Sequence, residues 1–438
     1  MFKRLRNLFI TAAIFLFSAQ AQLLSLSLTD ASSALGDIFS STVSANEGET
    51  SFRSFLIPFG GRAESLGNAY TGLCNDISFL RFNPAAGAIQ NQTQLALFHN
   101  SWIADSKMET LAYTTRLKNL RDLSLGGYIS CFYVPFTEYD AFGCRTTGSY
   151  YTETTGAFNI AYNFFSGYEF KGLALGATLK TAWRGVPDYT DNNSGAIISG
   201  SGLEQSALCF AADLGAMLQF NFLKFFYSRE PNVRIGFTAQ NLGAAITGFG
   251  SKQGIQLDDP ILTLFGTGIS VQIVKAITIS LDVKQPVNLS NMNGYLFPYF
   301  GAGFLFQFTD NLAFLSGFEL KGANPKFSTG FEFEFKKIQF NVNYTLDLAT
   351  SINPLNRISL SAKIKLGDKG RSLIDAKVDE YYEAGLKFYA DGEWEKAISI
   401  WQEALKINRR FDPAIIGIES AQYQIDMFEK IRQSLLIE

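Results

Sequence analysis

The chain has 438 residues and a formal net charge of -3 at neutral pH, so it lacks the basic character of a nucleic-acid-binding protein, and no nucleic-acid partner is expected. Aromatic residues make up 14% of the chain and charged residues only 18%, and 41 phenylalanines are unusual for a soluble protein of this size. One histidine and four cysteines argue against a His/Cys metal site, and the sequence implies no cofactor.

The first residues have the three parts of a secretory signal peptide. A basic start is followed by a short apolar run over residues 8–17 and then by Ala19-Gln20-Ala21, which fits an A-x-A cleavage site. An uncleaved membrane anchor is the alternative, but the run is short for a span of about 20 residues. Residues 1–21 are therefore expected to be a cleaved signal peptide, and residues 22–50, rich in Ser, Thr and Ala, a flexible segment.

Residues 61–89, GRAESLGNAYTGLCNDISFLRFNPAAGAI, fit neither a regular strand nor an ordinary helix. A short helix would begin at Arg62 and be broken by Gly67. Asn83-Pro84-Ala85 is a turn signal, because proline favours an extended residue before it and lacks an amide hydrogen. The stretch precedes the first alternating segment, and we expect it to lie in an N-terminal unit over residues 51–92.

From residue 93 to residue 366 the chain consists of alternating segments. For example, Phe331, Phe333 and Phe335 alternate with two glutamates. Successive side chains of a strand point to opposite faces, so each segment is predicted to be a strand with one apolar and one polar face. The strands, about fourteen in number, are expected at 93–102, 108–117, 123–134, 153–165, 171–183, 206–221, 233–242, 261–273, 276–285, 296–308, 311–321, 326–336, 338–348 and 357–366.

Three features favour a transmembrane β-barrel over a soluble β-sandwich, whose strands also alternate. Strands of about ten residues match a tilted membrane crossing, and aromatic residues cluster near segment ends. Short connections alternate with long ones, which are expected at 135–152, 184–205 and 243–260. The predicted fold is mainly β, a closed antiparallel barrel of about 14 strands, because a closed barrel satisfies its backbone hydrogen bonds in lipid.

The motif and the predicted strands together resemble the long-chain fatty-acid transporter (FadL-type) family and its PorV-like relatives in spirochaetes and Bacteroidetes. That family's N-terminal hatch has R-A-x-x-x-G-x-A, then an Asp, then N-P-A before the first strand. The pattern is matched here by Arg62, Ala63, Gly67, Ala69, Asp76, Asn83, Pro84 and Ala85. The resemblance spans residues 52–366, and Cys74 and Asn75 stand where relatives often have a second acid.

The resemblance implies that residues 51–92 form a hatch that plugs the barrel from the periplasmic side, with hydrophobic molecules bound in the extracellular half. Release would follow a shift of the hatch, and lateral exit through the wall is the route proposed for the family. The gate residues would be Arg62, Gly67, Asp76, Asn83, Pro84 and Ala85. A lumen charge network is expected to hold the hatch: Glu332, Glu334, Asp347, Lys363 and Lys365. The alternative is a static plug that merely fills the lumen.

From residue 377 the pattern becomes helical and resembles one tetratricopeptide repeat followed by a further helix. Small residues let two helices approach closely, aromatic residues fill the gap, and Asp412 with Pro413 opens a third helix. An even number of strands puts both chain ends on one side, so residues 377–438 are expected in the periplasm. The aromatic residues Tyr382, Phe388, Trp394 and Trp401 are candidates for binding a periplasmic protein.

Two functions follow as hypotheses. The first is passive uptake of hydrophobic compounds such as long-chain fatty acids across the outer membrane of a diderm bacterium, with membrane lipid and a hydrophobic small molecule as partners. The second is an outer-membrane scaffold or secretion-associated protein that binds a periplasmic partner through its helical tail. The predicted hatch disfavours a general porin.

No enzyme is expected. A Ser-His-acid triad would need the one histidine, His99, as its base, and His99 falls in the middle of a predicted strand, which disfavours an outer-membrane lipase. Cys131 and Cys144 could form a disulfide in an oxidising compartment, which their spacing alone does not decide.

Overall fold

The computed structural model describes most of the chain beyond its first 49 residues. The described residues are 50–103, 105–117, 122–139, 142–165, 167, 171–191, 194–226, 230–249, 256–289, 297–321, 324–348 and 356–435. The predicted signal peptide and flexible segment lie outside them, apart from Thr50. Among the described helices, none has both the length and the hydropathy needed to cross a membrane.

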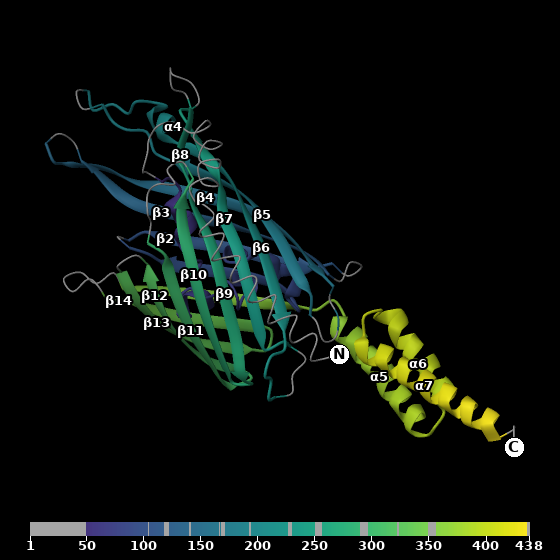
Figure 1. Ribbon diagram of the computed structural model, residues 1–438. Helices are drawn as coiled ribbons and strands as arrows, with labels where there is room; N and C mark the ends of the chain where they lie inside the picture. The colour runs from purple at the N-terminus through teal and green to yellow at the C-terminus, as the bar shows by residue number, and fades with distance from the viewer. Residues whose placement is uncertain are drawn as a thin grey trace.

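A closed antiparallel barrel forms the body of the molecule (Figure 1). Its sheet contains β1 (Thr93–Ser101), β2 (Lys107–Arg116), β3 (Leu123–Tyr139), β4 (Arg145–Phe164), β5 (Leu173–Gly185), β6 (Ala207–Phe220), β7 (Val233–Thr247), β8 (Gln256–Pro260), β9 (Leu262–Val274), β10 (Ile277–Asn288), β11 (Tyr299–Thr309), β12 (Leu312–Lys321), β13 (Asn324–Phe335), β14 (Ile338–Asp347) and β15 (Arg357–Gly367). Each strand pairs with its neighbour along the ring, and the pairs β1–β15 and β6–β7 complete the closure. Because β8 pairs with β7 outside the ring, the barrel has 14 strands, as predicted.

Two expected connections are partly strand. The prediction of a loop over 135–152 was wrong: β3 and β4 form one long hairpin there, paired from Leu123–Tyr162 to Tyr139–Arg145. Aromatic and β-branched residues are frequent in this stretch and favour an extended backbone. In the connection expected at 243–260, β7 continues to Thr247 and pairs with β8.

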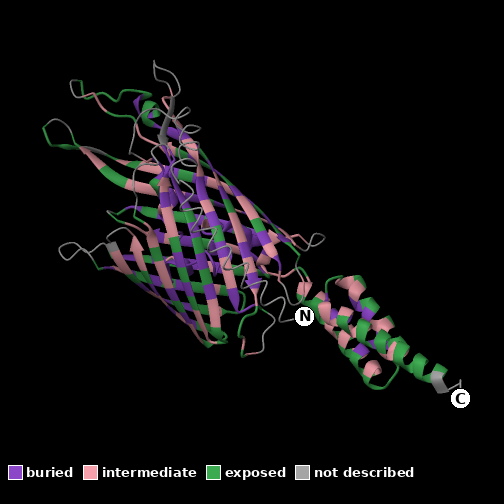
Figure 2. Cartoon of the chain, viewed as in Figure 1, coloured by how far each residue is buried: buried purple, intermediate pink, exposed green. Residues whose placement is uncertain are grey.

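The two faces of the wall differ as the alternation predicts (Figure 2). On β13, Phe331 and Phe333 are 56% and 49% exposed on the outside, whereas Glu332 between them is only 4% exposed because it points into the filled lumen. The neighbouring strand repeats the pattern, with Phe340 and Val342 outside and Asn341 inside. An apolar outer surface of this kind is what a barrel needs in contact with lipid tails.

The two ends of the barrel have different connections. One end, called the turn rim here, carries two-residue turns at 275–276, 310–311 and 336–337. The opposite end, called the loop rim, carries the connection over 186–206, which contains the short helix α4 (Ser201–Gln205), and the connection that contains β8. Figure 1 shows α4 and β8 together at that end.

The segment before β1 lies inside the barrel. Its short helical turns are η1 (Arg53–Leu56), α3 (Arg62–Ser65), η2 (Ile77–Arg81) and η3 (Pro84–Ile89). The turn α3 contacts β12 to β14, and η3 contacts β2 to β6, so the segment reaches opposite parts of the wall. Strand glycines make room for it: a Cβ added to Gly317 would collide with the backbone of Gly67, which itself has a positive φ of 61°.

Three helices follow β15 and extend beyond the barrel from the turn rim (Figure 1). They are α5 (Arg371–Ala390), α6 (Trp394–Ile407) and α7 (Asp412–Leu435), and the helix predicted from Asp412 begins at that residue. Their core surrounds Trp401, which is 1% exposed and packs against Gly385 and Gly417. Asp368 precedes α5 and accepts hydrogen bonds from Ser372 and from the Gly370 amide, which lowers the pKa of its carboxyl to about 2.

Replacing Phe331 by Arg should test which face meets lipid. An arginine near the bilayer midplane of such a barrel costs about 2–4 kcal/mol, because its charge loses water. We therefore expect Phe331→Arg to lower the free energy of unfolding from lipid vesicles by that amount, measured by denaturant titration, with Phe331→Leu as the control. Equal stability of the two variants would contradict a lipid-facing position.

Candidate functional site

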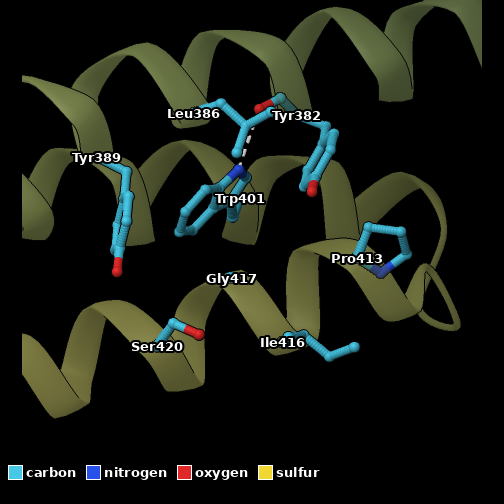
Figure 3. Close-up of a pocket in the computed structure, with 8 residues that line it drawn as sticks. All are labelled: Tyr382, Leu386, Tyr389, Trp401, Pro413, Ile416, Gly417 and Ser420. Carbon is cyan, nitrogen blue, oxygen red and sulfur yellow. Dashed lines mark hydrogen bonds between the residues drawn. The ribbon is translucent and has the colours of Figure 1, made fainter.

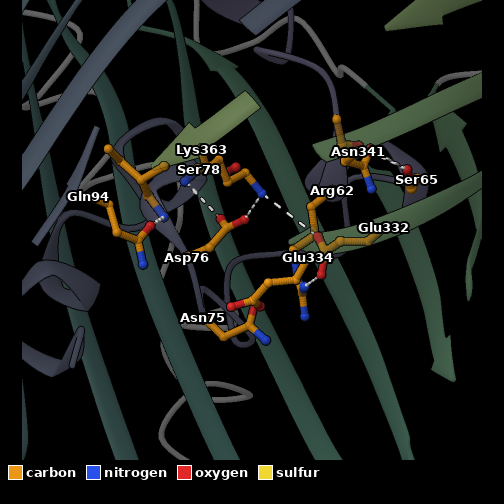
Figure 4. Close-up of polar contacts among 12 residues, drawn as sticks. Arg62, Ser65, Asn75, Asp76, Ser78, Gln94, Glu332, Glu334, Asn341 and Lys363 are labelled. Carbon is orange, nitrogen blue, oxygen red and sulfur yellow. Dashed lines mark hydrogen bonds and ion pairs between the residues drawn. The ribbon is translucent and has the colours of Figure 1, made fainter. Parts of the chain in front are cut away.

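Four buried charged side chains join residues 51–92, the segment inside the barrel that we call the hatch, to the wall (Figure 4). They form what we call the hatch network: Arg62 and Asp76 of the hatch with Glu332 of β13 and Lys363 of β15. Arg62 pairs with Glu332, and Lys363 pairs with Asp76 while its Nζ lies 3.9 Å from Glu332 Oε2. The exposed fraction of all four side chains is 9% or less. The four formal charges cancel, which is how buried charges are tolerated.

Asp76 is held by both the hatch and the wall. Its Oδ1 accepts hydrogen bonds from Tyr70 Oη at 2.7 Å and from the Ser78 amide at 2.9 Å, so it also caps η2. Burial alone would raise the pKa of Asp76, but Lys363 and Arg62 outweigh burial and lower it to about 2. Asp76 is therefore ionised and fixes the hatch to β15.

A second set of contacts involves residues that the sequence did not single out. Glu64 of α3 pairs with Arg357 of β15, and Asn100 Nδ2 donates to Glu64 Oε2 at 3.3 Å. Elsewhere on the wall, on β10, Asp282 Oδ2 accepts from the backbone amides of Tyr70 and Thr71, at 3.0 and 2.7 Å. The sequence did not identify Glu64 or Asp282 as a hatch contact, because their partners are far away along the chain.

The turn at Asn83-Pro84-Ala85 is seated against β4 to β6. Asn83 Oδ1 accepts from the Ala85 amide at 3.1 Å and caps η3, while its Nδ2 donates to Ala216 O at 3.2 Å. Asn159 Nδ2 of β4 donates to Pro84 O at 3.2 Å. A Cβ on Gly176 would meet the Pro84 carbonyl, so the turn and the wall are in direct contact.

The five residues of the predicted lumen network do not form one cluster. Glu332 and Lys363 contact the hatch, as described above. Glu334 and Lys365 instead pair with each other, with Nζ 2.5 Å from Oε1, and remain about one-quarter exposed. Asp347 is buried near the other end of its strand, where its amide donates to Asn356 Oδ1.

The lumen near the loop rim has an apolar part. Phe52 and Phe55 of the hatch pack there against small residues of the wall and one isoleucine: Ala182, Ala207, Cys209, Ala211, Ala245 and Ile261. Lys180 Nζ lies 4.8 Å from the centre of the Phe55 ring and 2.6 Å from Asp213 Oδ1. The sequence did not single out these residues, because small side chains on a strand carry little pattern.

The C-terminal helices enclose an aromatic groove of about 370 Å³ (Figure 3). Of the candidate partner-binding residues, Tyr382 and Trp401 line it, and Trp401 Nε1 donates to Tyr382 O at 3.1 Å. The groove is completed by Leu386, Tyr389, Pro413, Ile416, Gly417 and Ser420. Phe388 and Trp394 lie elsewhere in the helical core, Trp394 with its ring 5.6 Å from that of Phe428.

Within the described part of the chain, no group of three or more His, Cys, Asp or Glu residues is arranged to hold a metal ion. In the described part of the chain the four cysteines form no disulfide with one another, so Cys131 and Cys144 are not joined.

Removing the ammonium group of Lys363 should loosen the hatch. Lys363→Met leaves the Asp76 carboxylate buried without its partner, which typically costs 3–5 kcal/mol, so we expect a loss of about that size in the free energy of unfolding and faster leakage of small polar solutes from proteoliposomes. The matched control is Lys365→Met on the same strand, whose ion pair with Glu334 is about one-quarter exposed and should contribute about 1 kcal/mol or less. Equal losses in both variants would contradict the special role of the hatch network.

Comparison with known proteins places the chain among bacterial relatives of similar length. A UPF0164 protein of Treponema pallidum (strain Nichols) is 28% identical over 407 residues, covering 91% of this chain and 89% of the relative. A second protein of the same description and organism is 26% identical over 402 residues, covering 87% of this chain and 78% of the relative.

Among solved structures, the CymD monoaromatic hydrocarbon channel has a TM-score of 0.47 at 16% identity and covers 70% of this chain and 97% of its own. The Pseudomonas putida toluene transporter TodX has a TM-score of 0.43 at 12% identity, with 69% and 96% covered. A Pseudomonas aeruginosa FadL homologue has a TM-score of 0.38 at 10% identity, with 70% and 97% covered. A family model described as an uncharacterised protein family, UPF0164, matches residues 27–369, and the chain belongs to that family.

Proposed function

We propose that the chain is an outer-membrane channel for the passive uptake of hydrophobic compounds such as long-chain fatty acids, and that residues 51–92 are its gate. The observation that carries the proposal is the apolar lining of the lumen near the loop rim. The interior of a porin is polar, because water and polar solutes must pass through it. A lining of alanine and phenylalanine instead favours solutes that gain by leaving water.

The two hatch phenylalanines occupy the place that such a solute would take. Phe52 has a φ of 51°, a left-handed conformation that is costly for a bulky residue and persists only where its surroundings hold it. A hydrophobic ligand that packed on Ala182 and Ala245 could replace the ring of Phe52 and release that strain. Ligand entry would in this way shift the start of the hatch.

The wall between β6 and β7 offers an exit next to the hatch. Gln240 and Asn241 of β7 both face Asp213 of β6, so the ladder is interrupted by a bulge. Asn241 has a φ of 61° and its amide donates to Asp213 Oδ1 at 2.7 Å, while Gln240 Nε2 donates to the hatch at Phe82 O, 2.7 Å away. A shift of the hatch would break the Gln240 contact and free the bulge, which supports lateral release into the bilayer.

A charge placed in the apolar lining should reduce uptake. Ala245 is fully buried there, so Ala245→Asp would put a carboxylate in the path of a hydrophobic solute, and Ala245→Ser is the neutral control of similar size. We expect uptake of radiolabelled oleate to fall at least about tenfold, because a loss of only about 1.4 kcal/mol in the binding free energy of the solute is enough for a tenfold change. Uptake is measured in a host that lacks its own fatty-acid channel, and heat-modifiable migration confirms folding. No uptake above an empty vector with the wild-type protein would contradict the channel function.

The alternative function, a scaffold that binds a periplasmic protein, is supported by the groove between α5 and α7. Leu386 and Ile416 remain 43% and 55% exposed at its edges, and the Trp401 ring forms its floor. Aromatic grooves between helices are common sites for peptide segments. If the turn rim faces the periplasm, as short turns of such barrels do, the groove lies there as well.

Site-specific photocross-linking in cells tests this alternative. A photoreactive residue at Leu386 in the groove should yield a discrete cross-linked protein, whereas one at Leu373, which is 75% exposed on the same helix outside the groove, should not. Equal products at both positions, or none at Leu386, would contradict a partner in the groove.

A further inference from the structure

Three polar side chains lie in line on the outer wall of the barrel, at the loop-rim end of the β1–β2 hairpin. His99 Nδ1 is 2.6 Å from Glu109 Oε1, and His99 Nε2 is 3.1 Å from Ser101 Oγ. The inward residues of β1 at this level, Phe98 and Asn100, are buried in the lumen, whereas His99 and Glu109 have side chains that are 36% and 48% exposed. The three groups therefore face the surroundings of the barrel and not its interior.

Strand geometry alone builds this arrangement. His99 and Ser101 are two residues apart on β1 and so point to the same face, and Glu109 is the direct cross-strand partner of His99 on β2. On the sequence alone, the position of His99 within a strand disfavours a triad. In the structure, that position aligns His99 with the other two groups. On the outer face of a barrel such a residue is accessible.

The hydrogen bonds set the imidazole in the state that a general base needs. A carboxylate can only accept, so in a neutral imidazole the contact with Glu109 requires the proton on His99 Nδ1. Nε2 then carries a lone pair directed at the hydroxyl of Ser101, which donates to it. Carboxylate, imidazole and hydroxyl in this order are the parts of a serine hydrolase triad, which is recognised by geometry and not by sequence order.

The surroundings indicate the kind of substrate. Leu97 and Leu111, 59% and 45% exposed, lie one step further along the same outer face, so the triad stands where the apolar belt meets the hairpin end. The ester groups of a bilayer lie at this boundary between the hydrocarbon and the head groups. Lys107, exposed on the same face and directly opposite Ser101 in the register, supplies a positive charge for an anionic head group or for the oxyanion.

We propose that Ser101, His99 and Glu109 form an acyl-ester hydrolase site that acts on ester-linked membrane lipids at the outer wall of the barrel. Ser101 Oγ attacks the ester carbonyl carbon while its proton passes to His99 Nε2, and that proton then goes to the leaving glycerol oxygen as the ester C–O bond breaks. Water next attacks the acyl-serine with His99 as base, which releases a fatty acid and restores Ser101. Glu109 remains ionised throughout and stabilises the imidazolium. The proposal does not rest on the channel function, because the site lies outside the lumen.

The test uses the full chain, expressed in a host that lacks its own outer-membrane phospholipase and purified in detergent. Release of fatty acid from mixed micelles of phosphatidylglycerol is measured together with covalent labelling by a fluorophosphonate, located by peptide mass spectrometry. The wild-type protein should release fatty acid and carry the label on Ser101. Ser101→Ala should abolish the label and lower release at least about a thousandfold, and Glu109→Gln should lower release about a hundredfold.

The matched control is Thr154→Ala, which removes a hydroxyl from the outer wall elsewhere, on β4, and should leave both readouts unchanged. Heat-modifiable migration shows that each variant folds, which surface substitutions should not disturb. The proposal is overturned if the wild-type protein releases no more fatty acid than Ser101→Ala, if the label lies on another residue, or if Thr154→Ala loses as much activity as Ser101→Ala.

Discussion

Lipid offers no hydrogen bonds to a peptide group, and this constraint shapes the whole molecule. A sheet in a bilayer must close, and here the β1–β15 and β6–β7 pairs complete the ring. Closure fixes an inside and an outside for every strand, so the apolar residues face lipid and the remaining residues surround a lumen. The contacts of the hatch, the charge pairs, and the cluster of Ser101, His99 and Glu109 all depend on which side of the wall each residue faces.

In the filled lumen, buried charged side chains determine how the hatch fits against the wall. Isolated charges would be expensive in this interior, but Arg62, Asp76, Glu332 and Lys363 neutralise one another across the contact between hatch and wall. Such pairs favour the position of the hatch seen here, because a displacement at Arg62 or Asp76 would leave a charge buried without its partner. Gly317 and Gly176 also fix how the hatch fits, because there is no space for a side chain between hatch and wall at either position.

The alternating pattern was enough to predict the barrel and most of its strands, because a period of two is a strong signal wherever one face meets lipid. It failed at 135–152, where the strands rise beyond the apolar belt and both faces become mixed. In the hatch, the family resemblance pointed to Arg62 and Asp76, but Glu64 has no partner nearby in the sequence, and its contact with Arg357 requires the folded ring. The same is true of His99, whose neighbours on β2 depend on strand register, which the sequence leaves open.

The strands at the loop rim also end at very different heights. In the register, Ser101 at the end of β1 is level with Tyr133 of β3, and β3 continues to Tyr139, six residues further, so at about 3.3 Å per residue the β3–β4 hairpin extends for about 20 Å beyond the level where β1 stops. The wall is therefore lower at the β1–β2 hairpin than at the neighbouring β3–β4 hairpin. A large molecule that approached this edge from the β3 side would therefore meet the hairpin before it met the end of β1.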